Sequence, residues 1–310
     1  MIAWLARLLL LAQSGAAIGI YLLLTRKAGL DNALLAALLA VSAVFGVRLL
    51  VVFNNFMMAW RHRSPLPEQC RLDWPQRLAL FFGEAKASLL ASSWSMAFRR
   101  FHKCPANPRR GPPVLLIHGY GCNSGYWRAM SKALRAAGIT HHAIDMEPVF
   151  GSIDDYPPRI AAAIEELCRD TGCERIVLVA HSMGGLAARA YLRDFGVHRI
   201  AKVVTLGTPH HGTVLAQFGL GTNSREMHWR INAEARPGSE WLCRLVQRED
   251  PALYRLFVSV YSHHDNIVAP QDSSVLPGAD NIALHGIGHV ALGFHSQVQA
   301  LVVRQVLDTH

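Results

Sequence analysis

The sequence predicts an α/β fold, with a mostly parallel sheet covered by helices on both faces, preceded by a two-helix transmembrane hairpin. Three observations lead to this prediction. Residues 1–58 contain two long apolar runs, each about one bilayer thickness as a helix. From residue 113 onward, short apolar runs alternate with amphipathic segments, which is typical of buried parallel strands and crossover helices. One of these runs ends at a serine that stands among small residues.

The hairpin is assigned to residues 1–58, with helices at about residues 2–24 and 33–53. A cleaved signal peptide is the alternative for the first run, but no basic stretch precedes it and a second spanning run follows. Arg7 and Arg48 lie within the runs, near helix ends. We therefore expect both side chains to reach the lipid headgroups.

Positive charge is concentrated near the N-terminus. Residues 1–110 contain 14 lysines and arginines against 4 aspartates and glutamates, whereas residues 111–310 contain 17 against 18. Because the basic residues directly follow a membrane span, they predict contact with anionic headgroups rather than with nucleic acid. The positive-inside rule favours the cytoplasmic side for both ends of the hairpin. The predicted location is a bacterial inner membrane, crossed by two spans.

Residues 59–112 form a predicted basic juxtamembrane segment. Asp73 and Gln76 have the spacing of a capping box, so an amphipathic helix is expected at about residues 74–101, with Leu78, Phe82 and Leu89 at helical spacing. Two interpretations stay open, a helix packed on the following domain and a helix lying in the bilayer interface. A stretch containing several prolines then links this segment to the domain at residues 113–310.

The domain at residues 113–310 is expected to be built from alternating strands and helices. The predicted strands are residues 114–118, 141–144, 176–180, 203–206, 257–262 and 282–285, and the predicted helices are residues 126–137, 158–170, 183–195 and 294–307. An insertion at residues 214–247 interrupts the alternation. It is interpreted either as a lid over the site or as an irregular loop with a packed helix.

Cysteine and histidine spacing predicts no metal site, and no cofactor is expected. The six cysteines form no zinc motif, and six of the sixteen histidines fall in three adjacent pairs whose members would point in different directions. Cys168 and Cys173 are close enough to pair if the domain faces outside the cell, whereas reduced, buried thiols are expected in the cytoplasm. The sequence does not specify an oligomeric state.

Residues 176–185 have the pattern of a strand that turns sharply at Ser182 and continues as a helix. Such a turn holds the serine hydroxyl at its tip, and the small residues Ala180 and Gly184 let the two backbones approach closely. A serine nucleophile needs a base, a carboxylate that orients the base, and donors for the oxyanion. Ser182 is therefore the predicted nucleophile, for which partners must exist elsewhere in the chain.

The partners are predicted from chain order and strand ends. Asp265, in the loop beyond the strand at 257–262, is the predicted acid, with Asp272 and Asp280 as alternatives. His289, in a loop before the last helix, is the predicted base, with His285 as its competitor. The backbone amides of Tyr120 and Met183 are the predicted oxyanion donors. Because the carboxyl ends of parallel strands share one edge of the sheet, the fold is expected to bring these groups together.

Four motifs in this order resemble the α/β-hydrolase superfamily and, within it, the bacterial triacylglycerol lipases. Residues 180–185 are similar to the alanine-type serine elbow of the small Bacillus-type lipases, residues 117–121 to their oxyanion strand, and residues 206–213 to their G-T-P-H-x-G-[ST] stretch. The resemblance covers residues 113–310 and implies a serine hydrolase of carboxylic esters that needs no cofactor. Together with the hairpin it predicts a lipid ester substrate. A soluble ester or thioester, and a catalytically silent membrane scaffold, are the alternatives.

Overall fold

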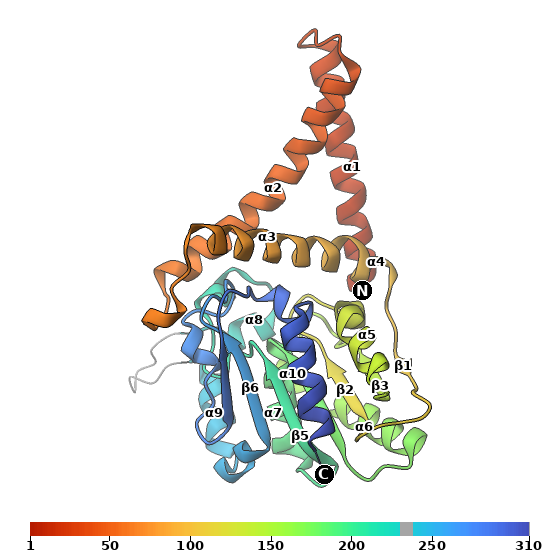
Figure 1. The fold of residues 1–310 in the computed structure, drawn as a ribbon, viewed down its shortest axis with the longest axis vertical. Coiled ribbons are helices and arrows are strands. Elements are labelled where there is room, and N and C mark those ends of the chain that lie inside the picture. Colours follow the sequence, from red (N-terminus) through yellow and green to blue (C-terminus); the bar gives the residue numbers. More distant parts are fainter. Residues whose placement is uncertain (230–237, 310) are drawn as a thin grey trace.

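The computed structural model describes residues 1–229 and 238–309 and has an α/β domain from which a helical hairpin projects (Figure 1). The described residues form one seven-stranded sheet in the order β1-β3-β2-β4-β5-β6-β7. All neighbouring strands are parallel except the short edge strand β1, which pairs antiparallel with β3. The strands are β1 Lys103–Cys104, β2 Val114–Ile117, β3 His141–Ile144, β4 Ile176–His181, β5 Ile200–Leu206, β6 Phe257–Ser262 and β7 Asp280–Leu284.

The central strands are buried on both faces, as their continuous apolar runs predict. Alternate residues of β2 belong to two different cores, with Leu115 and Ile117 on one face and Val114 and Leu116 on the other. The first face is covered by α6 (Pro157–Thr171) and α7 (Met183–Phe195), and the second by α5 (Arg128–Ala136) and α10 (Ser296–Leu307). Ile117 pairs with Ala180, so β2 and β4 end at the same level of the sheet.

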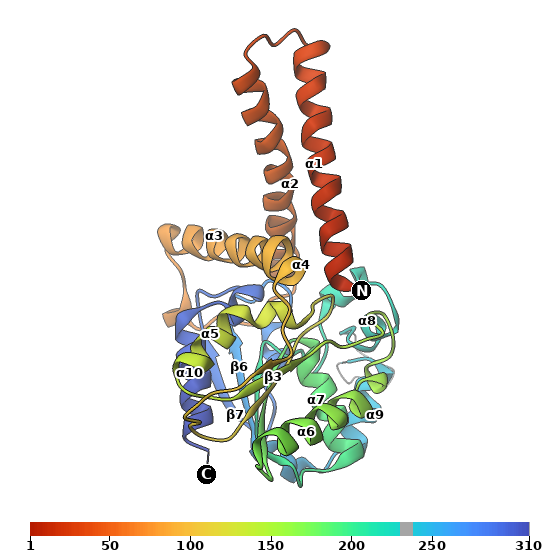
Figure 2. The same ribbon diagram turned by 90° about the vertical axis from the view of Figure 1, so that its right-hand side faces the viewer.

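The hairpin consists of α1 (Ile2–Arg26) and α2 (Ala33–Arg61), two antiparallel helices that project away from the sheet (Figures 1 and 2). Both helices are long and apolar enough to cross a membrane, and their most apolar windows are 0% and 17% buried inside the protein. The loop between them lies farthest from the sheet, whereas the N-terminus lies at the base, beside the α/β domain. The second helix extends past the predicted end at residue 53.

A third helical segment lies across the base of the hairpin, between the hairpin and the sheet (Figure 1). It comprises α3 (Trp74–Leu90), a π-helical turn (Ala91–Ser95) and α4 (Met96–Phe98), and we call residues 74–98 the platform helix. The predicted capping box is present, since Asp73 Oδ1 accepts from Gln76 N (2.8 Å) and Gln76 Oε1 accepts from Asp73 N (2.9 Å). The chain therefore enters this helix where the sequence predicts it.

The platform helix has two different faces. A stripe buried against the domain contains Leu80, Glu84, Ala87 and Ala91. Large apolar side chains are exposed at four-residue spacing on the rest of its surface, namely Trp74, Leu78, Phe82, Leu90, Trp94 and Phe98. The buried stripe thus packs on the domain, which agrees with the first interpretation of this helix. The remaining surface presents large apolar side chains to the surroundings.

The two arginines of the hairpin contact the platform helix. Arg7 Nε donates to the carbonyl oxygen of Ala97 (3.0 Å), and its guanidinium lies 5.4 Å from the ring centre of Phe98. Arg48 donates to the hydroxyls of Ser93 (2.6 Å) and Ser92 (3.3 Å). The platform helix crosses the hairpin near both side chains and supplies these oxygen acceptors. Contact of the two arginines with lipid headgroups stays a prediction.

Other differences from the sequence prediction are local. Residues 124–127 form a 3₁₀ turn (Ser124–Trp127) before α5, and the last helix is likewise preceded by a 3₁₀ turn, Val290–Gly293. Cys168 and Cys173 are free, so the disulfide alternative is not realised. The insertion contains a 3₁₀ turn (Val214–Phe218), α8 (Thr222–Glu226) and α9 (Glu240–Arg248). Residues 230–237, part of the predicted lid, lie outside the described residues.

Candidate active site

Ser182 stands at the junction of β4 and α7 in a strained backbone conformation. Its φ of 55° and ψ of −127° make it the one non-glycine residue with positive φ in the described chain. Such a conformation disfavours L-residues and persists only where the surrounding structure imposes it. Here Ser182 N donates to Leu206 O (2.9 Å) and Thr208 Oγ1 donates to Ser182 O (3.0 Å). The side chain is therefore held at the edge of the sheet, in a residue 8% exposed.

The residues around Ser182 are small because the backbones there are in contact. A Cβ on Gly184 would lie 2.5 Å from the carbonyl oxygen of Ile117, and one on Gly185 would lie 2.1 Å from Thr208 Oγ1. Ala180 is fully buried in the core of the sheet, where a small side chain fits. The close approach of α7 to β2 fixes the elbow that the sequence predicts.

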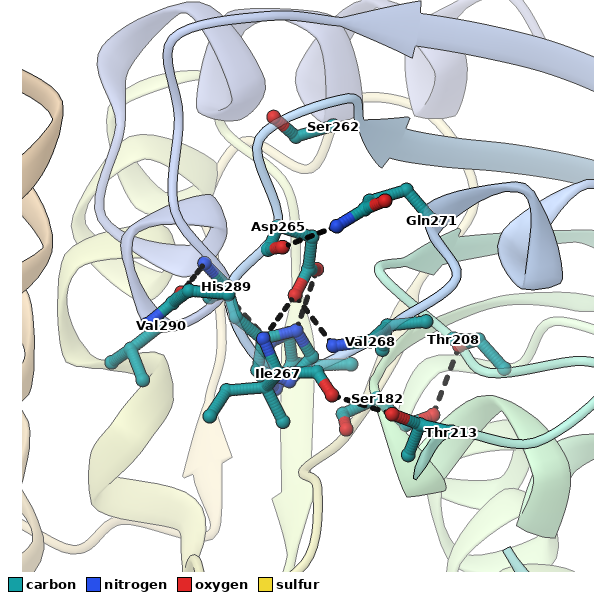
Figure 3. Close-up of polar contacts among 12 residues, drawn as sticks. Ser182, Thr208, Thr213, Ser262, Asp265, Ile267, Val268, Gln271, His289 and Val290 are labelled. Carbon is teal, nitrogen blue, oxygen red and sulfur yellow. Dashed lines mark hydrogen bonds and ion pairs between the residues drawn. The ribbon is translucent and has the colours of Figure 1, made fainter. Parts of the chain in front are cut away.

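The acid and the base predicted from sequence are in direct contact (Figure 3). His289 Nδ1 donates to Asp265 Oδ2 at 2.7 Å. Asp265 Oδ1 accepts from the backbone N–H groups of Ile267 (2.8 Å) and Val268 (2.7 Å), which fixes the carboxylate in the loop after β6. Both residues are buried, at 3% and 4% exposure. Because Nδ1 carries the proton, His289 Nε2 is left as the acceptor nitrogen.

The backbone of His289 is also held from two sides. His289 N donates to Asn266 Oδ1 (3.0 Å), and His289 O accepts from His181 Nε2 (3.1 Å). Figure 3 shows Ser182 at the same edge of the sheet as Asp265 and His289. No hydrogen bond joins Ser182 Oγ to His289 within the described residues. Catalytic hydrogen bonds often tighten only when substrate is bound, so the arrangement is compatible with a nucleophile and its base.

The alternative partners named from sequence lie elsewhere. The side chains of Asp272, Asp280 and His285 are exposed, and His285 lies just outside β7 rather than inside the predicted strand. Among these candidates, the structure brings only Asp265 and His289 into contact with each other. The reason is topological, since β6 and β7 are neighbouring parallel strands and the loops that follow them carry Asp265 and His289.

The electrostatics of His289 follow from its burial and its acidic neighbours. Burial would lower the pKa of His289, but the charge of Asp265, its hydrogen bond and a contribution from Glu84 outweigh burial and raise that pKa. His181, whose ring centre lies 4.6 Å from that of His289, has a pKa well below its ordinary value because of burial and the neighbouring His289. His181 is therefore neutral at physiological pH and positions His289 without competing for its proton.

Two backbone N–H groups beside Ser182 lack protein acceptors. Gly119 to Cys122 form a turn closed by Cys122 N donating to Gly119 O (3.3 Å), with Gly121 at φ +65°. Neither Tyr120 N nor Met183 N donates to another group in the part of the chain that the structure describes. A Cβ on Gly119 would lie 2.9 Å from Ser182 Cβ, so this turn lies against the serine. Two free donors next to a nucleophile can stabilise an oxyanion.

The Tyr120 side chain joins this turn to the insertion. Its hydroxyl donates to Leu220 O (2.8 Å) and accepts from Leu220 N (2.7 Å). Phe218 and Leu220 are 65% and 68% exposed. The sequence interpretation assigned Tyr120 a backbone role alone; the side chain additionally holds the exposed apolar part of the insertion near the site.

Sequence reasoning missed Glu84 of the platform helix. This carboxylate is 2% exposed, and its two oxygens accept from the backbone N–H groups of Val290 (3.0 Å) and Ala291 (2.9 Å), immediately after His289. Burial raises the pKa of Glu84, while the two backbone donors and His289 oppose that shift. The available signal was a glutamate within an otherwise apolar helical stripe, which requires a buried partner.

Comparison with known proteins identifies the family of the α/β domain. Residues 112–276 match the family model described as the alpha/beta hydrolase fold. The chain belongs to this α/β hydrolase family. The matched region contains the serine elbow, the turn at residues 119–122 and Asp265, whereas the hairpin, the platform helix and His289 lie outside it. The family assignment therefore confirms the predicted fold class.

The α/β hydrolase domain is similar to lipases in sequence and in structure. Triacylglycerol lipases of Pseudarthrobacter phenanthrenivorans and Burkholderia plantarii are each 30% identical over 116 residues, which is 34% of this chain and 35% and 32% of theirs. The chain thus spans about a third of the length of these curated relatives. The mature Bacillus licheniformis lipase BlEst2 superposes with a TM-score of 0.55 at 19% identity, covering 69% of this chain and 96% of that one.

Proposed function

We propose that this protein is a membrane-anchored serine hydrolase that cleaves the carboxylic esters of acyl lipids through an acyl-enzyme. The observation that carries the proposal is that a strained Ser182 and the Asp265–His289 pair lie at one edge of the sheet, beside two backbone N–H groups that have no acceptor among the described residues. These are the groups that acyl transfer to serine requires. The triacylglycerol lipases among the relatives support the same class of substrate.

In the proposed mechanism each group has one role. Ser182 Oγ attacks the ester carbonyl carbon while His289 Nε2 accepts the hydroxyl proton, and Asp265 holds the resulting imidazolium. The oxyanion accepts hydrogen bonds from the N–H groups of Tyr120 and Met183. The ester C–O bond then breaks, and His289 returns its proton to the leaving alcohol. Water, deprotonated by His289, hydrolyses the acyl-enzyme, and no cofactor takes part.

The membrane part of the proposal is supported by exposed apolar surface. Two helices suited to span a bilayer project from the domain, and the platform helix crosses their base with an exposed stripe of large apolar residues. An interfacial helix has this character, and the basic residues around it suit anionic headgroups. The N-terminus and the α/β domain lie at the same end of the hairpin, which together with the positive-inside rule favours a domain on the cytoplasmic face of a bacterial inner membrane.

A direct test combines one variant with one probe. We expect Ser182→Ala to abolish turnover of p-nitrophenyl butyrate by the full chain in detergent while the thermal unfolding temperature stays close to that of the wild type. A fluorophosphonate probe should label the wild type and not the variant. Unchanged turnover in Ser182→Ala refutes the mechanism. Failure of the folded wild type to react with the probe or with short and long esters favours a catalytically silent scaffold, and activity on short esters alone favours a soluble substrate.

A further inference from the structure

A cavity of about 350 Å³ lies between the hairpin, the platform helix and the loops that carry Asp265 and His289. Its walls are mostly apolar. Leu9 of α1 and Phe45 and Val52 of α2 line its upper part, Leu89 lines the platform-helix side, and Ile267 and Val290 line its end at the α/β domain. The cavity therefore extends from the level of the candidate spans to the active-site loops.

The domain end of the cavity lies directly beside the acid and the base. Val290 follows His289, and Ile267 N donates to Asp265 Oδ1 at 2.8 Å. Figure 3 shows Ile267 and Val290 next to the Asp265–His289 pair. An occupant that reaches this end of the cavity is within one or two residues of the groups proposed to carry out the chemistry.

The two charged side chains that line the cavity, Arg48 and Glu84, already have hydrogen-bond partners. Arg48 donates to Ser92 and Ser93, and both oxygens of Glu84 accept backbone N–H groups. An occupant therefore meets mostly apolar walls, and the charged groups among them are already hydrogen-bonded. A long apolar chain suits such walls, because it buries no polar group of its own there.

We propose that this cavity binds the acyl chain of a membrane lipid, so that the hairpin forms part of the substrate site as well as the anchor. The inference rests on the proposed function and specifies where its substrate lies. The walls formed by α1 and α2 would keep the acyl chain at hydrocarbon depth while the ester approaches Ser182. A lipid then enters sideways from the bilayer, and its chain need not cross water.

Narrowing the cavity tests this site. Ala85 of the platform helix lines the cavity, whereas Ala79 of the same helix is exposed and does not. We expect Ala85→Trp to lower kcat/KM for p-nitrophenyl palmitate by roughly ten- to a hundredfold relative to p-nitrophenyl butyrate, and the matched control Ala79→Trp to leave that ratio unchanged. If the tryptophan variant fails to fold, Ala85→Leu is used instead, and we expect it to lower the same palmitate-to-butyrate ratio by a smaller factor.

A binding measurement separates this site from the catalytic proposal. In phosphatidylethanolamine–phosphatidylglycerol vesicles, a diazirine-bearing palmitate should label α2 and the platform helix of the full chain, and Ala85→Trp should reduce that labelling. An unchanged palmitate-to-butyrate ratio together with labelling confined to other segments refutes the acyl-chain site. If the wild type hydrolyses no ester but is labelled as expected, the proposed function is refuted while the acyl-chain site is supported.

A second inference comes independently from Glu84. Its carboxylate accepts the N–H groups of Val290 and Ala291, which begin the 3₁₀ turn after His289 and have no partner within that turn. A Cβ on Gly288 would lie 2.5 Å from Glu84 Oε2, so the loop closes directly on the carboxylate from the other side of His289. We infer that Glu84 is a positioning residue, through which the platform helix fixes the backbone that carries the catalytic base.

This role predicts a change in rate and in pH dependence. The groups that face His289 are Asp265 from the loop after β6, His181 from β4, Glu84 from the platform helix and Tyr126, whose hydroxyl bonds to Val290 O. Glu84→Gln keeps the shape of the side chain, removes its charge and places an amide donor against one of the two N–H groups. We expect kcat for p-nitrophenyl butyrate to fall about ten- to a hundredfold with KM little changed.

The pH profile distinguishes positioning from a purely structural role. Because Glu84 contributes to the raised pKa of His289, the acid limb of kcat/KM should move to lower pH in Glu84→Gln. Glu84→Asp retains the charge and should keep the acid limb in place while recovering part of kcat. The inference is contradicted if the acid limb of Glu84→Gln does not move and its kcat falls only in proportion to the folded fraction. It is also contradicted if the kcat of Glu84→Gln equals that of the wild type.

Discussion

Replacing Asp265 by asparagine tests the assignment of the acid most sharply. Asp265 Oδ1 accepts two backbone N–H groups, at 2.8 and 2.7 Å, while Oδ2 accepts His289 Nδ1 at 2.7 Å. In Asp265→Asn the oxygen can keep both backbone bonds, and the amide nitrogen then faces Nδ1. That nitrogen must become an acceptor, so the imidazole proton moves to Nε2, which can no longer accept the proton of Ser182.

The expected loss is therefore catalytic rather than structural. A wrong tautomer in a serine triad lowers kcat by about 10⁴, or about 5.5 kcal/mol of transition-state stabilisation. Asp265→Ala should lose a similar amount of activity, but it also leaves two buried N–H groups unpaired, at about 1–3 kcal/mol each. We would measure p-nitrophenyl butyrate hydrolysis and urea unfolding for both variants. Asp265→Asn retaining more than about a tenth of wild-type kcat would refute the assignment.

Three further predictions follow from the same structure. The acid limb of kcat/KM should lie above the ordinary histidine pKa of about 6.5, because the pKa of His289 is raised. By linkage, the stability that His289 contributes is fully present below about pH 6.5 and is lost as the pH rises through the raised pKa. A limb below that value in a pH–rate profile would contradict this. Gly184→Ala should destabilise the fold by about 1–3 kcal/mol and lower activity, because its Cβ would lie 2.5 Å from Ile117 O. The control Gly83→Ala, helical and open around its Cβ, should raise the unfolding midpoint slightly. Glu249→Gln should lower the free energy of unfolding, measured in urea, by about 3–5 kcal/mol. The substitution removes the charged partner of the fully buried Arg189, whose Nη2 lies 2.6 Å from Glu249 Oε2. A loss of less than about 1 kcal/mol would show that the ion pair is not needed for stability.

Local patterns were sufficient to predict most of the sheet and the serine elbow. Residues 176–181 are apolar, β-branched in part and followed by small residues, and these properties act over a few neighbouring positions. The capping box at Asp73 is similarly local, and the structure contains both of its hydrogen bonds. Asp265 and His289 were predicted from their places after strands, because parallel strands deliver their following loops to one edge of the sheet.

The platform helix shows where local pattern stops being informative. Its periodicity predicts an amphipathic helix but not which stripe meets which neighbour, because a helix between two apolar surroundings has more than one apolar face. Leu78 and Phe82 proved to be exposed, whereas Leu80 and Ala87 pack on the domain. The protein partners of the hairpin arginines could not be predicted for a similar reason, since these acceptors belong to a segment that crosses the hairpin only in the folded chain.

The sequence by itself determined the α/β architecture, the two apolar helices and the identities of the proposed nucleophile, acid and base, because each depends on residue type and spacing within a short segment. Only the tertiary structure decided how the N-terminal region meets the site. Glu84 bonds to Val290 from a position 206 residues away, and the cavity that ends at Ile267 has walls from three separate helices. Contacts of this kind depend on the packing of whole elements, which spacing along the chain does not encode.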